Sequence, residues 1–196
     1  MIDPKGKGEL LSVGAKTYVE EQAKQYVYGY TPNVKTREME KGIVVEADSI
    51  ALLNEVLFTD YKKNQESREN DWITGTCDIF TWNHIHDVKS SWSLSTFPAF
   101  AKNGVDKSYE WQLRGYQMLW DVNSSEIDYC MVDTPAELIG YEDERLHFVS
   151  HIDPNLRVTR VPFTRTGEAE AKIKQRVSYC QAYFVEAVQD LINQHK

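Results

Sequence analysis

The sequence predicts a mixed α/β fold in which a central mixed β-sheet is flanked by helices. Helical apolar stripes lie toward both ends of the chain, and strand-like runs lie between them. A further helical segment separates these strands into two pairs, which gives the order α-α-β-β-α-β-β-α. No repeat, low-complexity tract or Pro/Gly-rich linker divides the 196 residues, so we expect one domain spanning 1–196.

Two helices are predicted in the first third of the chain. Residues 13–28 have a helical pattern, and residues 29–34 contain Gly, Pro and Asn, which indicate a loop. A helix over about 38–58 follows, and residues 61–71 are polar throughout, which predicts a surface loop. The apolar stripe of the second helix consists of Ile43, Ile50, Leu53 and Leu57.

The strands are predicted in the middle of the chain. Two strand-like runs, Trp72–Trp82 and His84–Ser90, are joined by a tight turn at Asn83. Residues 93–102 contain Pro98 and favour a short helix or a loop. The remaining predicted elements are a helix over 106–121, strands over 127–132 and 146–152, and a long helix over about 167–194.

Composition excludes several classes of protein. Hydrophobic residues make up 41% and charged residues 27%, a balance typical of soluble domains. No apolar run approaches the roughly 20 residues that span a bilayer, so we expect no membrane segment. The first residues lack the apolar core of a secretory signal, which favours a cytoplasmic location. Cys77, Cys130 and Cys180 form no C-x-x-C pair and are expected to be free thiols.

The formal net charge of −8 counts against a nucleic acid as partner. Duplex-binding proteins usually present a basic surface, because neutralising phosphates supplies much of their affinity. A small basic patch can nevertheless coexist with acidic metal ligands. Motifs, rather than composition, must therefore decide whether this chain acts on DNA.

One carboxylate lies on an apolar stripe. Glu46 follows the same helical spacing as Ile43 and Ile50. An ionised carboxylate on a core-facing stripe is costly unless a cation or a donor meets it. The alternative is that Glu46 lies at the first buried turn and faces solvent, which is the more frequent situation for such a residue taken alone.

The two central strands bring further charges together. Asp87 and Lys89 are two residues apart in one strand, so they point to the same face. Asp78, on the adjacent strand, can face them across the ladder. The alternative is a surface salt bridge on an amphipathic hairpin, but the flanking residues have the apolar character of buried strands.

A polar pair lies on the next helix. Gln112 and Tyr116 are four residues apart and share one side of that helix with Tyr109 and Leu119. A tyrosine at the edge of a core beside an exposed glutamine is an ordinary arrangement. This pair therefore gains meaning only together with the preceding motifs.

In order, these motifs resemble those of the PD-(D/E)XK nuclease superfamily, in particular its RecB-like and lambda-exonuclease (YqaJ-type) branch. The family has a helix glutamate, then G-x-x-D, (D/E)-x-K and Q-x-x-x-Y. The matching residues are Glu46, Gly75-Thr-Cys-Asp78, Asp87-Val-Lys89 and Gln112-Leu-Arg-Gly-Tyr116. The match covers about residues 35–120. Each motif alone is weak, and the middle acid is Asp87 where lambda-type members usually have glutamate.

The resemblance implies a restriction-endonuclease-like core and a DNA nuclease that uses Mg²⁺ or Mn²⁺. Asp78, Asp87, the Val88 carbonyl and Glu46 would hold the metal, since hard cations prefer oxygen ligands. Lys89 would orient or help to deprotonate the attacking water. Gln112 and Tyr116 would support the site. The cysteine set of cluster-bearing relatives is absent.

DNA contacts are expected beside these residues. Ser90 and Ser91 can donate hydrogen bonds to phosphate. Lys35, Arg37 and Lys41 can meet a DNA end or its 5′-phosphate, although a solvated run of charges is the more frequent situation. The resemblance also implies a ring-shaped homotrimer and a single-strand annealing protein as partner.

Other functions stay open. A structure-specific or repair endonuclease would share the same core, and a non-cleaving DNA-binding factor would keep the fold without cleavage. A metal enzyme acting on another substrate is a third alternative. Zinc is disfavoured, because His84 and His86 point away from the Asp87 face and no second His/Cys pair lies nearby in sequence. We expect His86 to be packed or hydrogen-bonded.

Overall fold

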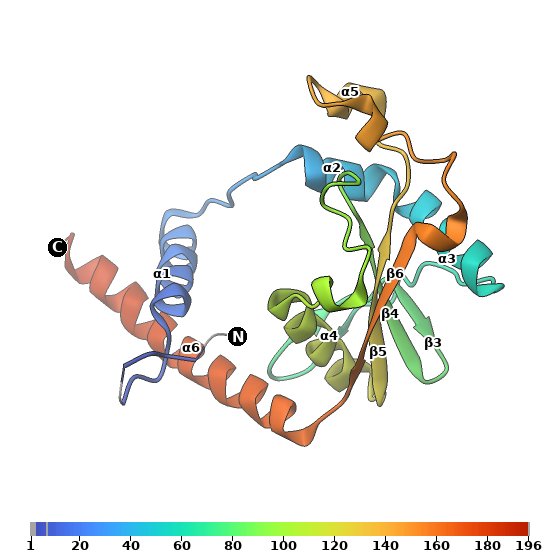
Figure 1. Ribbon diagram of the computed structural model, residues 1–196. Coiled ribbons are helices and arrows are strands. Elements are labelled where there is room, and N and C mark those ends of the chain that lie inside the picture. Colours follow the sequence, from blue (N-terminus) through green and yellow to red (C-terminus); the bar gives the residue numbers. More distant parts are fainter. Residues whose placement is uncertain (1–2, 7, 196) are drawn as a thin grey trace. The chain divides into compact units, whose positions relative to one another are not determined.

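A computed structural model describes residues 3–6 and 8–195 and divides them into two compact units (Figure 1). The first unit combines residues 1–34 with 166–196, and the second spans residues 35–165. The expectation of one domain over 1–196 stays a prediction. Each unit is described by itself.

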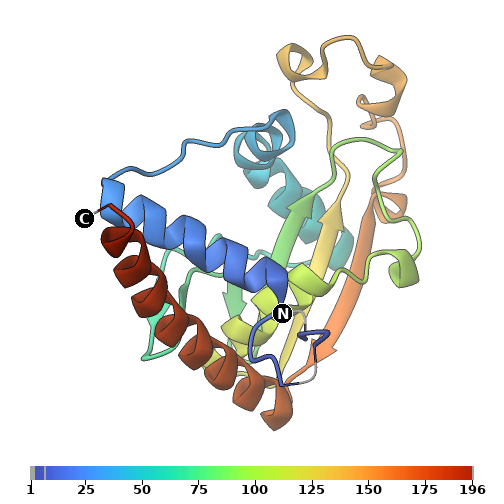
Figure 2. The same cartoon turned by 90° about the vertical axis from the view of Figure 1, so that its left-hand side faces the viewer.

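The first unit pairs the helices α1 (Val13–Tyr28) and α6 (Gly167–Asn193), which lie side by side (Figure 2). The Tyr183 hydroxyl donates to Glu20, and the ring of Tyr26 packs edge-on against Phe184 at 5.7 Å. Contacts advance in the same direction along both helices, so the helices run parallel. The expected bounds of both helices are confirmed to within one residue.

The second unit contains a four-stranded sheet with helices on both faces. Its longer elements are α2 (Arg37–Val44), α3 (Glu46–Leu57), β3 (Ile79–Thr81), β4 (His84–Ser90), α4 (Lys107–Trp120), β5 (Ser124–Cys130), α5 (Ala136–Ile139) and β6 (Val158–Thr164). A small ribbon pairs β1 (Arg68–Glu69) with β2 (Thr74–Gly75). Three short 3₁₀ turns complete it, at Ala101–Asn103, Glu144–Leu146 and Pro154–Leu156.

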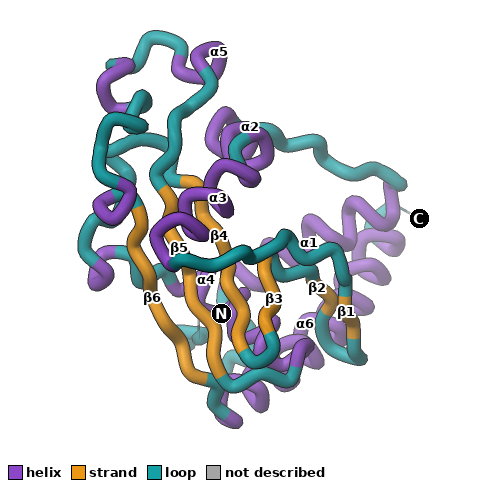
Figure 3. The backbone as a smooth tube through the Cα atoms, turned by 90° about the vertical axis from the view of Figure 1, so that its right-hand side faces the viewer, coloured by secondary structure: helices purple, strands orange, loops and turns teal. Residues whose placement is uncertain are grey.

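The strands are ordered β3-β4-β5-β6, as Figure 3 shows. β4 pairs antiparallel with β3 and parallel with β5, and β6 pairs antiparallel with β5. The parallel pair needs a crossover connection, and α4 provides it. The predicted mixed sheet flanked by helices is therefore confirmed. In the register of the parallel pair, Asp87 lies opposite Ile127 and His86 opposite Glu126.

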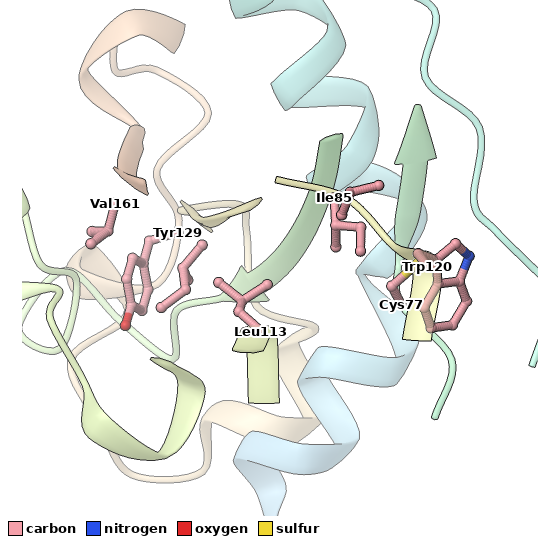
Figure 4. Packing of buried hydrophobic residues seen from close by; sticks show 8 residues of the cluster. Cys77, Ile85, Leu113, Trp120, Tyr129 and Val161 are labelled. Atoms are coloured by element: carbon pink, nitrogen blue, oxygen red, sulfur yellow. The ribbon is translucent and has the colours of Figure 1, made fainter. Parts of the chain in front are cut away.

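Each face of the sheet carries its own core. On the α4 face the buried cluster is Cys77, Ile85, Leu113, Trp120, Val122, Ile127, Tyr129 and Val161 (Figure 4). On the α3 face it is Val45, Ile50, Leu52, Leu53, Ile79, Cys130 and Val132. Alternate residues of β4 belong to opposite faces, because side chains alternate along a strand. The α4 face thus receives Ile85, Asp87 and Lys89.

The predicted helix over 38–58 is two helices. The chain leaves helical geometry at Val45, which separates α2 from α3. Val45 is 3% exposed and packs with Ile50, whereas Ile43 is 78% exposed. The expected position of Ile43 on the buried stripe is therefore wrong. The break changes which residues of α2 face inward, and it makes Glu46 the first residue of α3.

One predicted strand is wrong, and β1, within the expected loop over 61–71, and β6 were not predicted. Residues 146–152 form turns, although Val149 is fully buried. The fourth strand is instead β6, which contains Pro162. Proline cannot donate to a sheet ladder and is confined to edge strands. β6 is the edge strand of this sheet, so Pro162 is tolerated there.

Two expectations from composition concern thiols and membranes. All three cysteines are free; Cys77 and Cys130 are buried and Cys180 is half-buried, as expected. Across residues 3–6 and 8–195, no helix combines the length and the apolar character needed to cross a membrane.

Candidate active site

A buried ion pair lies on the α4 face of β4. Asp87 is 1% exposed, and its Oδ2 lies 2.6 Å from Lys89 Nζ. Burial raises the pKa of Asp87 above its ordinary value, while Lys89 opposes that shift. Burial lowers the pKa of Lys89, but the charge and hydrogen bond of Asp87, together with the charges of Asp78 and Tyr109, outweigh burial, so the pKa of Lys89 lies above its ordinary value. Asp87 and Lys89 thus point to the same face of β4, as the period of two along a strand predicted.

Asp78 lies one residue before β3, where the ladder places it beside Asp87. The next pair of this ladder is Ile79 with His86. Asp78 Oδ2 accepts a hydrogen bond from the Val88 amide at 2.8 Å. Burial raises the pKa of Asp78 to about 6, and the charge of Asp87 adds to the shift. Two carboxylates therefore crowd one buried place, and each makes ionisation of the other costly.

Glu46 is close enough for its charge to raise the pKa of Asp78 further. Its side chain is 26% exposed and forms an ion pair with Lys63. Glu46 therefore neither faces open solvent nor lies deep in the core. No sequence pattern indicated a role for Lys63, which lies in the segment expected to be a polar surface loop. The contact spans 17 residues, and only folding brings the two charges together.

These residues suit a hard divalent cation. Asp78, Asp87 and Glu46 present carboxylate oxygens, which Mg²⁺, Mn²⁺ and Ca²⁺ prefer. Burial and the charge of Asp87 hold the pKa of Asp78 near 6 despite the charge of Lys89. A further cation bound here would favour the ionised form of Asp78. The donor set thus fits the cation that the motifs imply. The part of the Val88 carbonyl stays a prediction.

Gln112 and Tyr116 reach the same site from α4. Lys89 Nζ donates to Gln112 Oε1 at 3.3 Å, and Gln112 Nε2 donates to the Tyr116 hydroxyl at 2.9 Å. The Tyr116 ring packs on Gly75, where an added Cβ would lie 2.6 Å from Tyr116 Cε1. This close approach explains why a glycine precedes Asp78 by three residues. The structure brings all six predicted catalytic residues into one region.

Tyr109 also lies beside the candidate site. The sequence pattern placed it on the same helix face as Gln112 and Tyr116 but indicated no role for it. Lys89 Nζ lies 4.7 Å from the centre of the Tyr109 ring. A cation over an aromatic face is attracted to it. Tyr109 therefore helps to fix the Lys89 ammonium between Asp87 and Gln112.

The two serines after Lys89 have internal partners. The Ser90 hydroxyl lies 2.7 Å from the Ser49 hydroxyl of α3, and Ser91 is 9% exposed. The Ser91 carbonyl accepts from Lys41 Nζ at 2.6 Å. Contacts from Ser90 and Ser91 to phosphate stay predictions.

The basic residues around α2 differ from one another. Arg37 Nη1 donates to the carbonyls of Leu138 and Ile139 at 3.1 and 3.0 Å, and its guanidinium lies 5.3 Å from the Trp92 ring centre. Arg37 therefore anchors the α5 segment. Lys35 is exposed, as a contact to DNA requires.

Lys41 is fully buried, where the sequence favoured a solvated charge. Besides Ser91 O, its Nζ donates to the carbonyls of Trp92 and Val132, both at 3.0 Å. Burial lowers the pKa of Lys41 to about 8. Because Lys41 is 0% exposed, the expectation that it meets a DNA end is wrong. It instead satisfies three carbonyls beyond the ends of β4 and β5.

His84 and His86 lie on the face of β4 opposite Asp87, as expected. His86 Nδ1 lies 2.8 Å from Asp128 Oδ2, which confirms that His86 is hydrogen-bonded. Burial lowers the pKa of His86, but the bonds to Asp128 and Glu126 raise it to about 9. Glu126, a neighbour of both histidines, was not predicted, because it lies on β5 and only the pairing of β5 with β4 brings it opposite His86.

Solved structures similar to this chain include exonucleases. A phage-related exonuclease from Haemophilus somnus 129PT is 33% identical, covers 97% of this chain and 91% of its own, and superposes with a TM-score of 0.90. The chain belongs to the lambda-exonuclease-like branch of the PD-(D/E)XK nucleases. It is therefore a nuclease, and the restriction-endonuclease-like fold expected from its motifs is confirmed.

A more distant likeness agrees with this fold. The alkaline exonuclease LHK-Exo from Laribacter hongkongensis is 11% identical and has a TM-score of 0.69, covering 95% of this chain and 88% of its own. The same enzyme in complex with dAMP gives 14% identity and a TM-score of 0.66, covering 92% and 84%. No family model matches the chain, and no curated protein does.

Proposed function

We propose that this nuclease is a Mg²⁺-dependent exonuclease, also active with Mn²⁺, that hydrolyses linear double-stranded DNA. The observation that carries the proposal is the group of buried Asp87 and half-buried Asp78, in which Lys89 pairs with Asp87 and donates to Gln112. The exonuclease relatives support the direction of the proposal, since the one from Haemophilus somnus 129PT covers 97% of this chain.

The metal would be held by the carboxylates of Asp78 and Asp87, the Val88 carbonyl and Glu46. When bound, it activates water and stabilises the charge that develops on the scissile phosphate. The pairing of Glu46 with Lys63 makes Glu46 the weakest candidate for direct contact, and contact through water suits it better. The ion-pair partner of Asp87 is Lys89, which belongs to the candidate site itself.

Lys89 is best suited to donate hydrogen bonds rather than to accept a proton. Its ion pair with Asp87 raises the pKa of the ammonium, so Lys89 stays protonated near neutral pH. A protonated Lys89 orients the attacking water or a phosphoryl oxygen and adds positive charge beside it. Of the two roles that the sequence left open, orienting the water is therefore the one we favour.

Gln112 and Tyr116 act as positioning residues. Gln112 accepts from Lys89 and donates to Tyr116, so the helix α4 fixes the direction of the ammonium. Packing of Tyr116 on Gly75 ties the same chain of contacts to the segment that carries Asp78. Small shifts in such a chain cost catalysis, because reacting groups must be held closely.

The biological setting is part of the same proposal. We infer a phage-type recombination nuclease that works as a ring-shaped homotrimer with a single-strand annealing protein. In the host cell it would act in the cytoplasm. Lys35, Ser90, Ser91 and Arg37 are the proposed DNA contacts, of which the exposed Lys35 is the most accessible.

The test is digestion of linear duplex DNA, with and without 5′-phosphate, beside closed circular DNA. The parent protein, Lys89→Ala and Lys107→Ala are compared in Mg²⁺, Mn²⁺, Ca²⁺ and EDTA. Lys107 is an exposed lysine at the start of α4 and serves as the matched control. We expect Mg²⁺-dependent loss of linear DNA that Lys89→Ala slows by at least about 100-fold and Lys107→Ala leaves unchanged.

Each outcome separates one alternative. Cleavage of closed circles would favour the structure-specific endonuclease. DNA binding without cleavage in any metal would favour the non-cleaving factor. A preference for 5′-phosphorylated ends would assign the direction of digestion, and light scattering would test the trimer.

A further inference from the structure

A second group of metal-ligating side chains lies on the face of the sheet opposite the candidate active site. It consists of His84 and His86 on β4 and Glu126 on β5. Their ligand atoms all lie within 4.8 Å of one another, the one such group of three found in residues 3–6 and 8–195. The mechanism proposed for the nuclease uses none of these side chains.

The hydrogen bonds of His84 decide which ring nitrogen carries its proton. The Ser124 hydroxyl donates to the Asn83 carbonyl at 3.3 Å. A hydroxyl has one proton, so at His84 Nδ1, 2.7 Å away, Ser124 is the acceptor and the ring is the donor. In the neutral ring, the lone pair is then on Nε2. That atom is buried and has no hydrogen-bond partner.

The His84 lone pair points at another acceptor. Glu126 Oε1 lies 3.4 Å from His84 Nε2 and 3.0 Å from His86 Nδ1. Two acceptors facing each other inside a protein repel unless a cation lies between them. Two ligands bound at about 2.0–2.1 Å to a tetrahedral zinc ion lie roughly 3.3 Å apart. The separation of Nε2 and Oε1 has this magnitude.

Charged side chains surround this group on both strands. Asp128 is fully buried beside His86, and Arg160 forms ion pairs with both Glu126 and Asp128. A zinc ion would displace the proton that His86 Nδ1 shares with these carboxylates, since metal binding requires a deprotonated ligand nitrogen. Neutral imidazole and carboxylate ligands favour Zn²⁺ over Mg²⁺.

The Ser124 contact also has the form found around metal-bound histidines. Such histidines donate their second ring nitrogen to a neighbouring oxygen, which fixes the tautomer and the direction of the ring. His84 Nδ1 and Ser124 provide this arrangement. His84 is 27% exposed at its side chain, which gives an ion a route to the site.

We propose that His84, His86 and Glu126 form a zinc site that links β4 to β5 behind the active site. The ligand atoms are His84 Nε2, His86 Nδ1 and a Glu126 carboxylate oxygen, and Asp128 is adjacent for the fourth position. The ion would join neighbouring strands of the parallel pair and so stabilise the strand that carries Asp87 and Lys89. The proposal does not depend on the substrate or the direction of digestion.

The experiment measures zinc binding to the full chain after the two carboxylates of the candidate active site have been replaced. The background is Asp78→Asn with Asp87→Asn, so that the candidate catalytic site does not compete for the ion. The protein is stripped with chelator, loaded with Zn²⁺ and passed through gel filtration. Bound zinc is counted by atomic emission, and Co²⁺ replaces zinc to show tetrahedral coordination by its visible spectrum.

We expect one zinc per chain and a melting temperature that rises with Zn²⁺ concentration. His84→Gln should weaken zinc binding by more than 100-fold, and Ser124→Ala by about 10-fold, since a residue that orients a ligand contributes about that much. His151→Gln changes an exposed histidine outside the group and should leave binding unchanged.

His84 is chosen because it is the less buried histidine, and circular dichroism checks that each variant folds. Absence of zinc from the folded background protein would overturn the proposal, and so would unchanged binding in folded His84→Gln. Either result would leave His86 bridged to its carboxylates by a proton instead of a metal ion.

Discussion

The charge of Asp78 is the feature of the active site with the clearest energetic consequence. Its pKa is raised from 3.8 to about 6 by burial and by Asp87. A carboxyl whose pKa is higher in the folded state stabilises the fold below its unfolded pKa. That stability is lost as the pH rises through the folded pKa. At neutral pH and without metal, ionised Asp78 therefore weakens the fold.

We therefore expect Asp78→Asn to stabilise the metal-free protein at pH 7.5 by about 1–3 kcal/mol. This is the free energy that corresponds to the shift in the pKa of Asp78, reduced because solvent screens part of the interaction. The asparagine keeps an oxygen for the Val88 amide and removes the charge. Urea unfolding in EDTA measures the change, and nuclease activity should disappear. Most of the gain should vanish at pH 4, where Asp78 of the folded parent is protonated and therefore as neutral as the asparagine. A variant less stable than the parent at pH 7.5 would contradict this account.

The contact between Gly75 and Tyr116 leads to a second prediction at the residue scale. In Gly75→Ala the new Cβ would lie 2.6 Å from a ring atom of Tyr116, so the ring must move. Overpacking of this kind costs about 1–3 kcal/mol. Because Tyr116 holds Gln112, we expect kcat to fall while DNA binding is kept.

Gly42→Ala is the control for that change. Gly42 lies within α2, and a Cβ there meets nothing within 4 Å. Alanine should be neutral or stabilise the protein by about 0.5–1 kcal/mol, because it restricts the unfolded chain. Equal kinetics for Gly75→Ala and the parent would show that the position of Tyr116 is unimportant.

At the scale of elements, α2 fastens the ends of two strands through one buried lysine. Lys41 donates to the carbonyls of Ser91, Trp92 and Val132. Lys41→Met fills similar space but removes this donor. The Trp92 carbonyl keeps a hydrogen bond from the Thr134 hydroxyl, whereas the Ser91 and Val132 carbonyls lose their lysine donor, at about 1–3 kcal/mol each. We expect a loss of about 3 kcal/mol or more in urea unfolding. Lys107→Met, at an exposed position, should stay within about 0.5 kcal/mol of the parent, and a similar result for Lys41→Met would refute the role of the lysine.

The elements also show what the sequence was able to predict. The bounds of β4 were predicted because a strand has a strict period of two, and the same period put Asp87 and Lys89 on one face. The break at Val45 was missed, because the apolar pattern continues across it. β6 was missed because Pro162 weakens a strand pattern, and its edge position, which makes the proline tolerable, depends on the whole sheet.

The same limit applies to the partners of the active site. Glu46, Asp78 and Asp87 were found from spacing and from the resemblance to a family. The pairing of Lys63 with Glu46 and the buried position of Lys41 were not predicted, because their contacts cross 17 and 50 residues of chain. Local periodicity predicts which face a side chain occupies, but it does not predict which distant residue meets it there.

On the scale of the whole molecule, the net charge of −8 must be reconciled with a DNA substrate. Several basic side chains of the nuclease unit are already paired with acidic ones. These pairs are Arg37–Glu142, Lys63–Glu46, Arg68–Glu66, Lys89–Asp87, Arg114–Glu110 and Arg160–Glu126. Few cations thus remain to neutralise phosphates, and the acidic remainder repels the duplex. Binding should rely on a small number of contacts near the active site.

This predicts a weak dependence of DNA binding on salt. Each neutralised phosphate contributes about −0.9 to the slope of log K against log salt concentration. We expect a slope no steeper than about −3 between 50 and 200 mM NaCl. The measurement is fluorescence anisotropy of a linear duplex in Mg²⁺. The protein used is the Lys89→Ala variant, because it cleaves DNA much more slowly than the parent. Lys35→Ala in the same background should reduce the slope by about 1 if Lys35 meets phosphate. A slope steeper than about −5 would require an extended basic surface and would refute binding through a few local contacts.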